Sequence, residues 1–387
     1  MKITQVEIFE VTYPNTPNWH PVLIRIGTDE GISGVGEVGL AYGTGGSAGA
    51  GMVKNLAENF LIGANPFRIE ELWDTMYRKT FWGQGGGPVI FGGMSAIDIA
   101  LWDIKGKRLQ APVWDLLGGK ARHKVRALSI GVSGGTPDEV AAKAKAVKEQ
   151  GFTALKFTPM PGEWWLQSYS NVVRGSVAMV EAVRETVGWD FDVALEIHRN
   201  MLPSEAVVFI QEVAKYLPYF IEDPIAPDGV VAMGEVAEKM SLPLAVGERN
   251  TGIWEFRDFV QLSKPHFLKP DVGLAGGIGH VKKIAAMAES HHIRMAPHNF
   301  LSPIVTAACV QLGTCTPNWD VIEGLPEDEP PRSAIVKHAV PIVDGYYIPP
   351  ETPGIGVEFD EEEASRLPFD PMGHPPPIRE DGSVALR

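Results

Sequence analysis

From about residue 123 onward, short apolar stretches alternate with amphipathic ones, and this alternation limits the folds open to the chain more than any other feature. Neighbouring parallel strands need a crossover helix, so the alternation predicts a parallel sheet. Seven such units and an eighth candidate strand at 319–322 fit a closed barrel better than an open sheet. No dinucleotide-binding fingerprint follows the first strand, which further weakens the open alternative. The expected strands are VRALSIGV, ALKFT, VALEIH, YFIEDP, PLAVGE, HFLKPD and IRMAPH, and the expected helices cover 137–150, 204–217 and 279–290.

Residues 1–122 do not show this alternation of strand and helix patterns. Two alternating stretches, 3–11 and 22–26, flank a polar, Pro-rich turn at 13–21 and predict antiparallel strands, and a helical pattern covers 94–107. Two Gly-rich segments, 39–51 and 81–88, lack the spacing of phosphate-binding loops, so we expect mobile loops there. Residues 336–387 return to turns and short strands and are expected to pack back on residues 1–122. This division leaves residues 123–335 for the barrel.

Composition excludes several classes of function. The 387 residues carry 34 Lys and Arg against 48 Asp and Glu, a formal charge of −14 without any basic run, which argues against nucleic acid or an anionic membrane as the main partner. Cys309 and Cys315 form neither a disulfide framework nor a CxxC metal pair, so a reducing compartment is expected. The first residues lack a secretory signal, and no apolar run approaches the ~18 to 20 residues that span a bilayer. We therefore expect a cytoplasmic protein.

Three carboxylates stand where predicted strands end: Glu196 in VALEIH, Glu222 in YFIEDP and Glu248 in PLAVGE, each 26 positions after the one before. A parallel barrel brings these strand ends to one rim, and neighbouring strands lie about 4.8 Å apart. Three anions so close repel one another unless a cation lies between them. Oxygen ligands suit Mg²⁺ first and Mn²⁺ second. The alternative is that each acid caps a helix or pairs with a lysine.

The next two strand ends carry Asp271 in HFLKPD and His298 in RMAPHN. A carboxylate beside an imidazole fixes its tautomer and raises its basicity, so this pair predicts a general base. His198 lies two residues after Glu196, on the same face of an extended segment, where we expect a general acid more than a metal ligand. Glu323, near the eighth strand, is expected to hydrogen-bond to the substrate or to His298, with a solvated loop acid as the alternative. The remaining histidines, including His266, His280, His291 and His292, are expected at the surface.

The segments ALWDIKGK, APVWDLLGG, LKF, LEIH, FIEDP, GER, KPDVGLAGGI and APHN together resemble the enolase superfamily, in its mandelate racemase subgroup and among the acid-sugar dehydratases. The resemblance covers essentially the whole chain. It implies a modified (β/α)7β TIM barrel under an N-terminal α+β capping domain, an even-numbered homo-oligomer, and Mg²⁺ held by Glu196, Glu222 and Glu248. It also assigns the base to His298 oriented by Asp271, the acid to His198, and contact with the developing enediolate to Glu323.

Two residues depart from the family pattern. The first metal ligand is Glu196 where the galactonate enzymes usually have Asp, which shifts the ion or its coordination. Racemases of the subgroup present Lys-x-Lys at the second barrel strand, whereas this chain has Lys156 and Thr158. We assign Lys156 to substrate binding, and the missing second lysine argues against two-base proton transfer. In the cap, Trp19, His20 and Tyr42 are expected to close over the polyol end of the substrate.

The function expected from these residues is Mg²⁺-dependent dehydration of a sugar acid, an aldonate such as galactonate, gluconate or mannonate, to a 2-keto-3-deoxy acid through an enediolate. Mg²⁺ stabilises the enediolate and an imidazole accepts the proton; the superfamily's use of a Lys or His base with Mg²⁺ is established chemistry. Two alternatives remain: an epimerase or cycloisomerase of the same superfamily, and a non-catalytic sugar-acid-binding protein.

Overall fold

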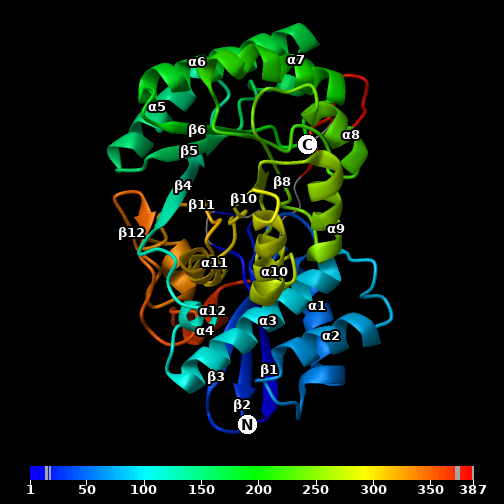
Figure 1. Ribbon diagram of the computed structural model, residues 1–387, viewed down its shortest axis with the longest axis vertical. Helices are drawn as coiled ribbons and strands as arrows, with labels where there is room; N and C mark the ends of the chain where they lie inside the picture. Colours follow the sequence, from blue (N-terminus) through cyan, green and yellow to red (C-terminus); the bar gives the residue numbers. More distant parts are fainter. Residues whose placement is uncertain (14–15, 17–18, 371–374, 386–387) are drawn as a thin grey trace.

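The N-terminal part of the protein contains a three-stranded antiparallel sheet. The computed structural model describes residues 1–13, 16, 19–370 and 375–385, so part of the predicted turn at 13–21 lies outside the described residues, as do 371–374 and 386–387 of the C-terminal segment. Strands β1 (Ile3–Glu10), β2 (Val22–Thr28) and β3 (Ser33–Val38) pair in that order (Figure 1). The two predicted strands are confirmed, and the sequence reading missed β3, whose glycines weaken a strand pattern.

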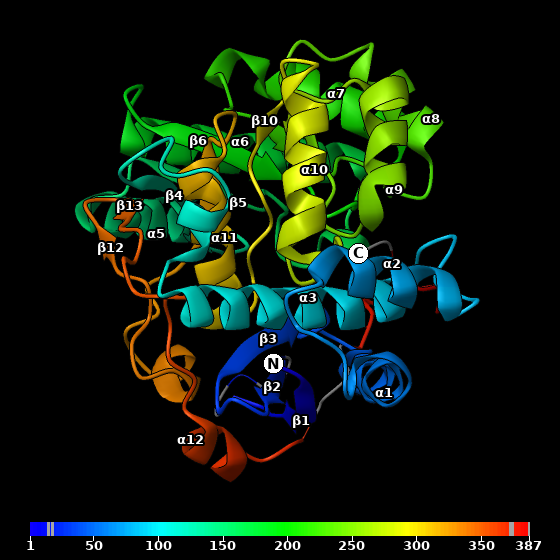
Figure 2. The same cartoon turned by 60° about the horizontal axis from the view of Figure 1, so that its bottom comes forward.

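Helices α1 (Gly46–Leu56) and α3 (Pro88–Leu109) pack against this sheet. The π-helical turn η1 (Ala57–Leu61), α2 (Ile69–Lys79) and the short α4 (Val113–Leu116) complete this part of the chain. The long α3 lies between the sheet and the barrel helices (Figure 2). It approaches β3 so closely that a Cβ on Gly36 would stand 2.0 Å from the carbonyl oxygen of Ala96. Within the described part of the chain, no helix is both long enough and apolar enough to cross a membrane.

The expectation of a mobile loop over residues 39–51 is wrong for its second half, which is the start of α1. The glycines there allow close packing: a Cβ on Gly49 would lie 2.6 Å from Val38 Cγ1, and one on Gly46 would lie 3.2 Å from Val22 Cγ2. Gly-rich sequence therefore reflects a tight helix–sheet contact at this place. The second segment, 81–88, is irregular until α3 begins at Pro88.

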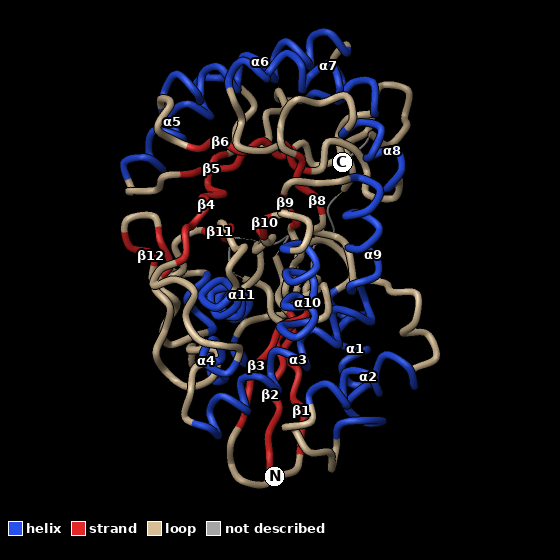
Figure 3. The backbone as a smooth tube through the Cα atoms, viewed as in Figure 1, coloured by secondary structure: helices blue, strands red, loops and turns tan. Residues whose placement is uncertain are grey.

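Eight parallel strands close into a barrel, as the alternation predicts (Figure 3). Consecutive strands pair from β4 to β10, and β11 pairs with β4. The last gap closes between β10 and the start of β11, where Met295 N–H donates to Asn318 O and Asp320 N–H donates to Met295 O, each at 2.9 Å. The strands are β4 (Val125–Val132), β5 (Ala154–Phe157), β6 (Asp192–Glu196), β7 (Ile221–Glu222), β8 (Leu244–Val246), β9 (Phe267–Leu268), β10 (Arg294–Met295) and β11 (Val321–Gly324).

Seven helices follow the first seven strands and surround the barrel. They are α5 (Pro137–Glu149), α6 (Tyr169–Val187), α7 (Pro203–Val213), α8 (Val230–Ala237), α9 (Gly252–Asp258), α10 (Gly277–Glu289) and α11 (Pro303–Cys315). Inside the ring, small and large side chains together fill the interior, as is usual for such barrels. That inner cluster consists of Leu128, Ala154, Ala194, Phe220, Ala245, Phe267, Ala296 and Val321. The observed architecture is thus a (β/α)7β barrel with an N-terminal cap.

The C-terminal segment contacts both parts. Its hairpin, β12 (Ile342–Val343) and β13 (Tyr346–Tyr347), adds to the barrel sheet by antiparallel pairing of β13 with β4. Farther along, the helix α12 (Glu361–Arg366) precedes residues that reach the cap. There Thr12 N–H donates to Pro368 O at 2.8 Å, and Asp370 N–H donates to Thr12 Oγ1 at 3.0 Å.

The prediction that His280 lies at the surface is wrong. His280 is 3% exposed, and its ring stacks on Trp73 of α2 with centroids 3.6 Å apart. Its position on α10 faces the cap, a contact that helical periodicity within the barrel does not reveal. His266, His291 and His292 are exposed, as expected.

We predict that Gly36→Ala destabilises the protein by about 3 kcal/mol or more, because its methyl group collides with the backbone of α3 and neither element can move independently. Thermal or urea unfolding measures the change. The matched control is Gly51→Ala, an exposed position on α1 with no atom within 4 Å of the new methyl group, which should stabilise by up to about 1 kcal/mol. Equal stabilities for the two variants would contradict the close contact between α3 and β3.

Candidate active site

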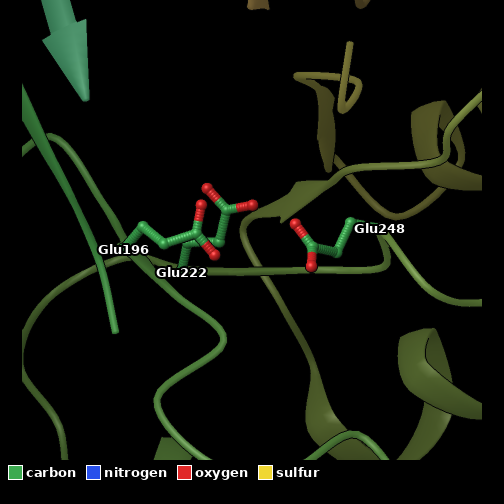
Figure 4. Close-up of side chains that lie close together, drawn as sticks. All are labelled: Glu196, Glu222 and Glu248. Atoms are coloured by element: carbon green, nitrogen blue, oxygen red, sulfur yellow. The ribbon is translucent and has the colours of Figure 1, made fainter. Parts of the chain in front are cut away.

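Three glutamates converge: Glu196 and Glu222 end β6 and β7, and Glu248 lies two residues after β8. Glu196, Glu222 and Glu248 each place one carboxylate oxygen within 4.8 Å of the others (Figure 4). Register explains the first contact, since Glu196 and Glu222 are paired residues on adjacent parallel strands. One buried oxygen of Glu196 and one of Glu222, Oε1 in both cases, have no hydrogen-bond partner. Unsatisfied carboxylate oxygens at a shared point are what a cation site requires.

Two lysines lie on the interior side of these acids. Lys156 Nζ on β5 donates to Glu196 Oε2 at 2.5 Å and to Glu222 Oε2 at 3.0 Å, and it also contacts Glu323 Oε1. Lys269, which directly follows β9, donates to Glu323 Oε1 at 2.5 Å and lies 3.3 Å from Glu222 Oε2. Both lysines are buried. Lys156, predicted to bind substrate, is therefore bonded to the acids at the base of the site.

An arginine neutralises the third glutamate. Arg199 Nη1 contacts Glu248 Oε1 and donates to Asp223 Oδ2 at 3.1 Å. Burial acts to raise the pKa of Glu248, but the charge of Arg199, followed by those of His298 and His198, outweighs it and holds that pKa well below its usual value. Glu248 is thus ionised across the physiological range.

The charges in this cluster do not balance. Counted as formal charges, the acids Glu196, Glu222, Asp223, Glu248 and Glu323 outnumber the buried cations Lys156, Lys269 and Arg199 by two. The exposed Arg249, whose Nε lies 3.6 Å from Glu248 Oε1, reduces this excess to one. Burial, and then the charge of Glu196, raises the pKa of Glu222 to about 8, and burial also raises the pKa of Glu196. A divalent cation held by the three glutamates would offset the remaining negative charge, and the two unpartnered oxygens are available as ligands. The donor set and its charge therefore fit a hard divalent ion such as Mg²⁺.

Beside the glutamates lies the predicted carboxylate–imidazole pair. His298 Nδ1 donates to Asp271 Oδ2 at 2.6 Å, and the opposite nitrogen, Nε2, lies 3.9 Å from Glu248 Oε2. The side chain of His298 remains 22% exposed, so Nε2 is reachable from the mouth. Burial acts to lower the pKa of His298, but the hydrogen bond to Asp271 and the charge of Glu248 raise it to about 9.

His198 lies on the opposite side of the glutamate cluster. Its Nε2 lies 3.5 Å from Glu196 Oε1, and its Nδ1 lies 3.1 Å from Thr158 Oγ1. Thr158 stands where racemases have a second lysine, and here it orients the imidazole. Enclosure by the surrounding protein lowers the pKa of His198, although 46% of its side chain remains accessible to solvent. The ring is therefore neutral in the unliganded protein, and an acid role requires that it gain a proton when an anionic substrate binds.

Glu323 on β11 is buried, which excludes the solvated loop acid. Besides its contacts with Lys156 and Lys269, it accepts a hydrogen bond at Oε2 from Asn299 N–H at 3.2 Å. Burial acts to raise the pKa of Glu323, but the two lysines outweigh it and lower that pKa. Glu323 thus links the residue after His298 to the lysines at the base of the site.

The predicted cap residues lie near the His298 segment. Trp19 is buried and stacks on Phe300 with centroids 5.3 Å apart, and Tyr42 meets the same ring edge-on at 6.0 Å. His20 is buried, with Nε2 2.5 Å from Gly43 O, whereas Tyr42 is 51% exposed. Of the three, Tyr42 presents the most side chain to solvent.

Sequence reasoning missed three charged residues of the cluster. Lys269 had a signal, a lysine in the otherwise apolar stretch HFLKPD, two residues before Asp271. Asp223 also had a signal, because it directly follows Glu222, a predicted metal ligand. Arg199 had none, because its placement depends on consecutive left-handed residues, with φ of 51° at His198 and 65° at Arg199, which no pattern of side chains indicates.

Comparisons with known proteins all point to one superfamily and together cover most of the chain. The family "Mandelate racemase / muconate lactonizing enzyme, N-terminal domain" matches residues 10–118, and "Enolase C-terminal domain-like" matches residues 139–364. D-galactonate dehydratase from Cronobacter sakazakii is 37% identical over 369 residues, 94% of this chain and 93% of that protein. A member of the enolase superfamily from Salmonella Typhimurium has a TM-score of 0.90 and 37% identity, covering 95% of this chain and 98% of that one. A mandelate racemase/muconate lactonizing enzyme from Jannaschia sp. CCS1 has a TM-score of 0.88 and 29% identity, with both chains covered fully.

We predict that Mg²⁺ raises the melting temperature of the protein and that Glu222→Gln removes this shift. The substitution keeps the shape of the side chain but removes its charge, so the affinity for Mg²⁺ should fall by more than about 100-fold, beyond what loss of an outer partner causes. Calorimetric titration with MgCl₂ measures the affinity. Glu235→Gln, an exposed change on α8, is the control and should bind as the wild type does. Undiminished binding to Glu222→Gln would rule out this site.

Proposed function

Since the chain belongs to the enolase superfamily, in its mandelate racemase and muconate lactonizing enzyme subgroup, we propose that it is a Mg²⁺-dependent dehydratase that converts a sugar acid to a 2-keto-3-deoxy acid. The relative from Cronobacter sakazakii supports the dehydratase reaction and an aldonate as the substrate class. Galactonate, gluconate and mannonate differ only in the stereochemistry of their hydroxyl groups. The proposal therefore names a class of substrate and not one isomer.

One juxtaposition carries the proposal: a histidine with a carboxylate partner lies at the edge of the cluster of three glutamates. His298 Nε2 is 3.9 Å from Glu248 Oε2, while its Nδ1 is fixed by Asp271. A carboxylate substrate held at the glutamate cluster would thereby present the hydrogen on its second carbon to His298 Nε2. A general base must come within hydrogen-bond reach of the proton it accepts, and such contacts often tighten only when the substrate is bound.

In the proposed mechanism His298 Nε2 accepts the proton from C2. Mg²⁺, when bound, stabilises the negative charge that this removal adds to the substrate carboxylate. Lys156, beneath the cluster, adds a positive charge on the same side. Asp271 keeps the hydrogen of His298 on Nδ1, which leaves Nε2 free to accept. A cation bound by Glu248 would offset the charge of this carboxylate, so Glu248 would raise the pKa of His298 less. The pKa of His298 would then lie closer to neutral pH.

The second half of the reaction is loss of the hydroxyl group on C3. We assign its protonation to His198, which lies across the glutamate cluster from His298 and is held by Thr158. The enol that remains then tautomerises to the keto acid. Only one base and one acid are assigned. Thr158 cannot act as the second base, because a threonine hydroxyl does not accept a proton near neutral pH as a lysine amine can. This argues against a two-base epimerisation.

The cellular location and the oligomeric state are also proposed. A cytoplasmic location and an even-numbered homo-oligomer are proposals that rest on the composition and the family. We also propose Tyr42 as the cap residue that meets the hydroxylated end of the substrate, because it presents half of its side chain to solvent beside Phe300.

We predict that the protein with Mg²⁺ converts at least one five- or six-carbon aldonate or aldarate to a 2-keto-3-deoxy acid. The measurement is incubation with a library of sugar acids, followed by semicarbazide detection of the keto product. Exchange of the C2 hydrogen in deuterated water without loss of hydroxyl would indicate an epimerase or cycloisomerase instead. Ligand-induced thermal shifts without any chemistry would indicate a binding protein.

We also predict that substitutions of the two histidines affect different steps of the reaction. His298→Asn should slow both dehydration and C2 hydrogen exchange by about 100- to 10,000-fold, the usual contribution of a general base. His198→Asn should slow dehydration but still permit exchange of the C2 hydrogen with deuterated water, because the base remains. The control is the exposed His291→Asn. Loss of exchange in His198→Asn, with retained metal binding, would overturn the assignment of acid and base.

A further inference from the structure

The end of cap strand β3 touches both barrel loops that carry the Asp271–His298 pair. In Figure 2 the cap sheet lies against α3, on the side opposite the barrel helices α10 and α11. From there, Glu37 and Gly39, two residues apart near the end of β3, extend to different partners. Glu37 contacts the segment that follows His298, and Gly39 contacts the segment that follows Asp271.

Glu37 holds the segment after His298. Its two carboxyl oxygens each lie 3.1 Å from Ser302 N, and Oε2 lies 2.5 Å from Ser302 Oγ. Ser302 in turn caps α11, since its Oγ accepts from Ile304 N–H at 3.2 Å. Glu37 is fully buried, and burial raises its pKa to about 8, so a neutral side chain of the same shape can replace it. This anchor at Ser302 lies four positions after His298, with three residues between them.

Gly39 holds the segment after Asp271. Its N–H donates to Gly273 O at 2.8 Å, and Gly273 N–H donates to Asp271 Oδ1 at 2.7 Å. The two glycines meet backbone to backbone, because a Cβ on Gly39 would stand 2.6 Å from the carbonyl carbon of Gly273. One oxygen of Asp271 is thereby fixed through Gly273, and the other bonds His298.

These contacts form a closed circuit. It runs from Glu37 to Ser302, back along four residues to His298, across to Asp271, on to Gly273 and through Gly39 to β3. Two parts of the circuit are covalent chain: residues 298–302 and the step from Gly39 back to Glu37. Every other link is a hydrogen bond between described residues. Of the cap, only β3 contributes to this circuit.

We propose that the Glu37–Gly39 end of β3 is the positioning element that sets the Asp271–His298 pair, so that docking of the cap brings the base into register with the glutamate cluster. The proposal rests on the proposed function, in which that pair is the base. A displacement of about 1 Å at a reacting group can cost about 100-fold in rate, so a rigid reference outside the barrel has a direct catalytic effect. The proposed ligands Glu196, Glu222 and Glu248 lie at or just after the ends of other strands and do not belong to the circuit.

The first test is Gly39→Ala, whose new methyl group pushes the Asp271 segment away from β3. The expected result is a fall in kcat of about 10- to 100-fold, with KM and the affinity for Mg²⁺ at wild-type values. Gly51→Ala, an added methyl group elsewhere in the cap, is the matched control and should keep wild-type kinetics. An unchanged kcat in a folded Gly39→Ala protein would overturn the proposal.

The second test covers the case in which Gly39→Ala fails to fold. Glu37→Ala should lower kcat in the same selective way, and Glu37→Gln, which keeps an acceptor for Ser302, should restore it to near the wild-type level. A merely structural role predicts instead that kcat, KM and metal affinity worsen together as the melting temperature falls. Equal kcat values for Glu37→Ala and Glu37→Gln would contradict the assignment.

A measurement without substrate separates this inference from the proposed function. In protein with ¹⁵N-labelled histidine, the Nδ1 proton of His298, bonded to Asp271, should give a downfield NMR signal that His298→Asn removes. The signal should weaken or shift in Gly39→Ala and Glu37→Ala and remain in Glu37→Gln and Gly51→Ala. Should no sugar acid be turned over, the proposed function fails while this signal still tests the circuit. An identical signal in every variant except His298→Asn would overturn the inference even for an active dehydratase.

Discussion

The excess of buried negative charge at the mouth of the barrel is the constraint on which the rest of the structure depends. Glutamates at three successive strand ends cannot share one small volume without cations, since each pair repels strongly in a low-dielectric interior. Lys156, Lys269 and Arg199 supply part of the compensation from below and beside the acids. The remainder fits a divalent ion. A cluster of this kind stabilises no fold by itself, so the barrel must hold it together.

The barrel and cap supply that support in different ways. Closure between β10 and β11 fixes the register of every strand, and the register in turn sets the height of each glutamate on the rim. The cap packs through glycines that let β3 approach α3 and the loop after Asp271 without side chains between them. The barrel thus carries the acids, and the cap contacts the loops that follow Asp271 and His298.

Periodicity and spacing predicted most of this arrangement. Apolar strands at regular spacing predicted the barrel, and acids at the ends of those strands predicted the cluster, because parallel strands bring equivalent positions to one rim. Predictions were wrong where tertiary contacts decide: Gly46 begins a helix because it packs against β2, and His280 is buried because the cap covers it. Arg199 depends on a left-handed backbone that side-chain types do not encode.

The central claim, that Glu196, Glu222 and Glu248 hold one divalent cation, is tested most directly by anomalous diffraction from crystals soaked in MnCl₂. The account predicts a single strong anomalous peak among the three carboxylates, with one oxygen of each within bonding distance of Mn²⁺. A map without a peak there, or with Mn²⁺ bound elsewhere while Lys156 alone bridges Glu196 and Glu222, would contradict it.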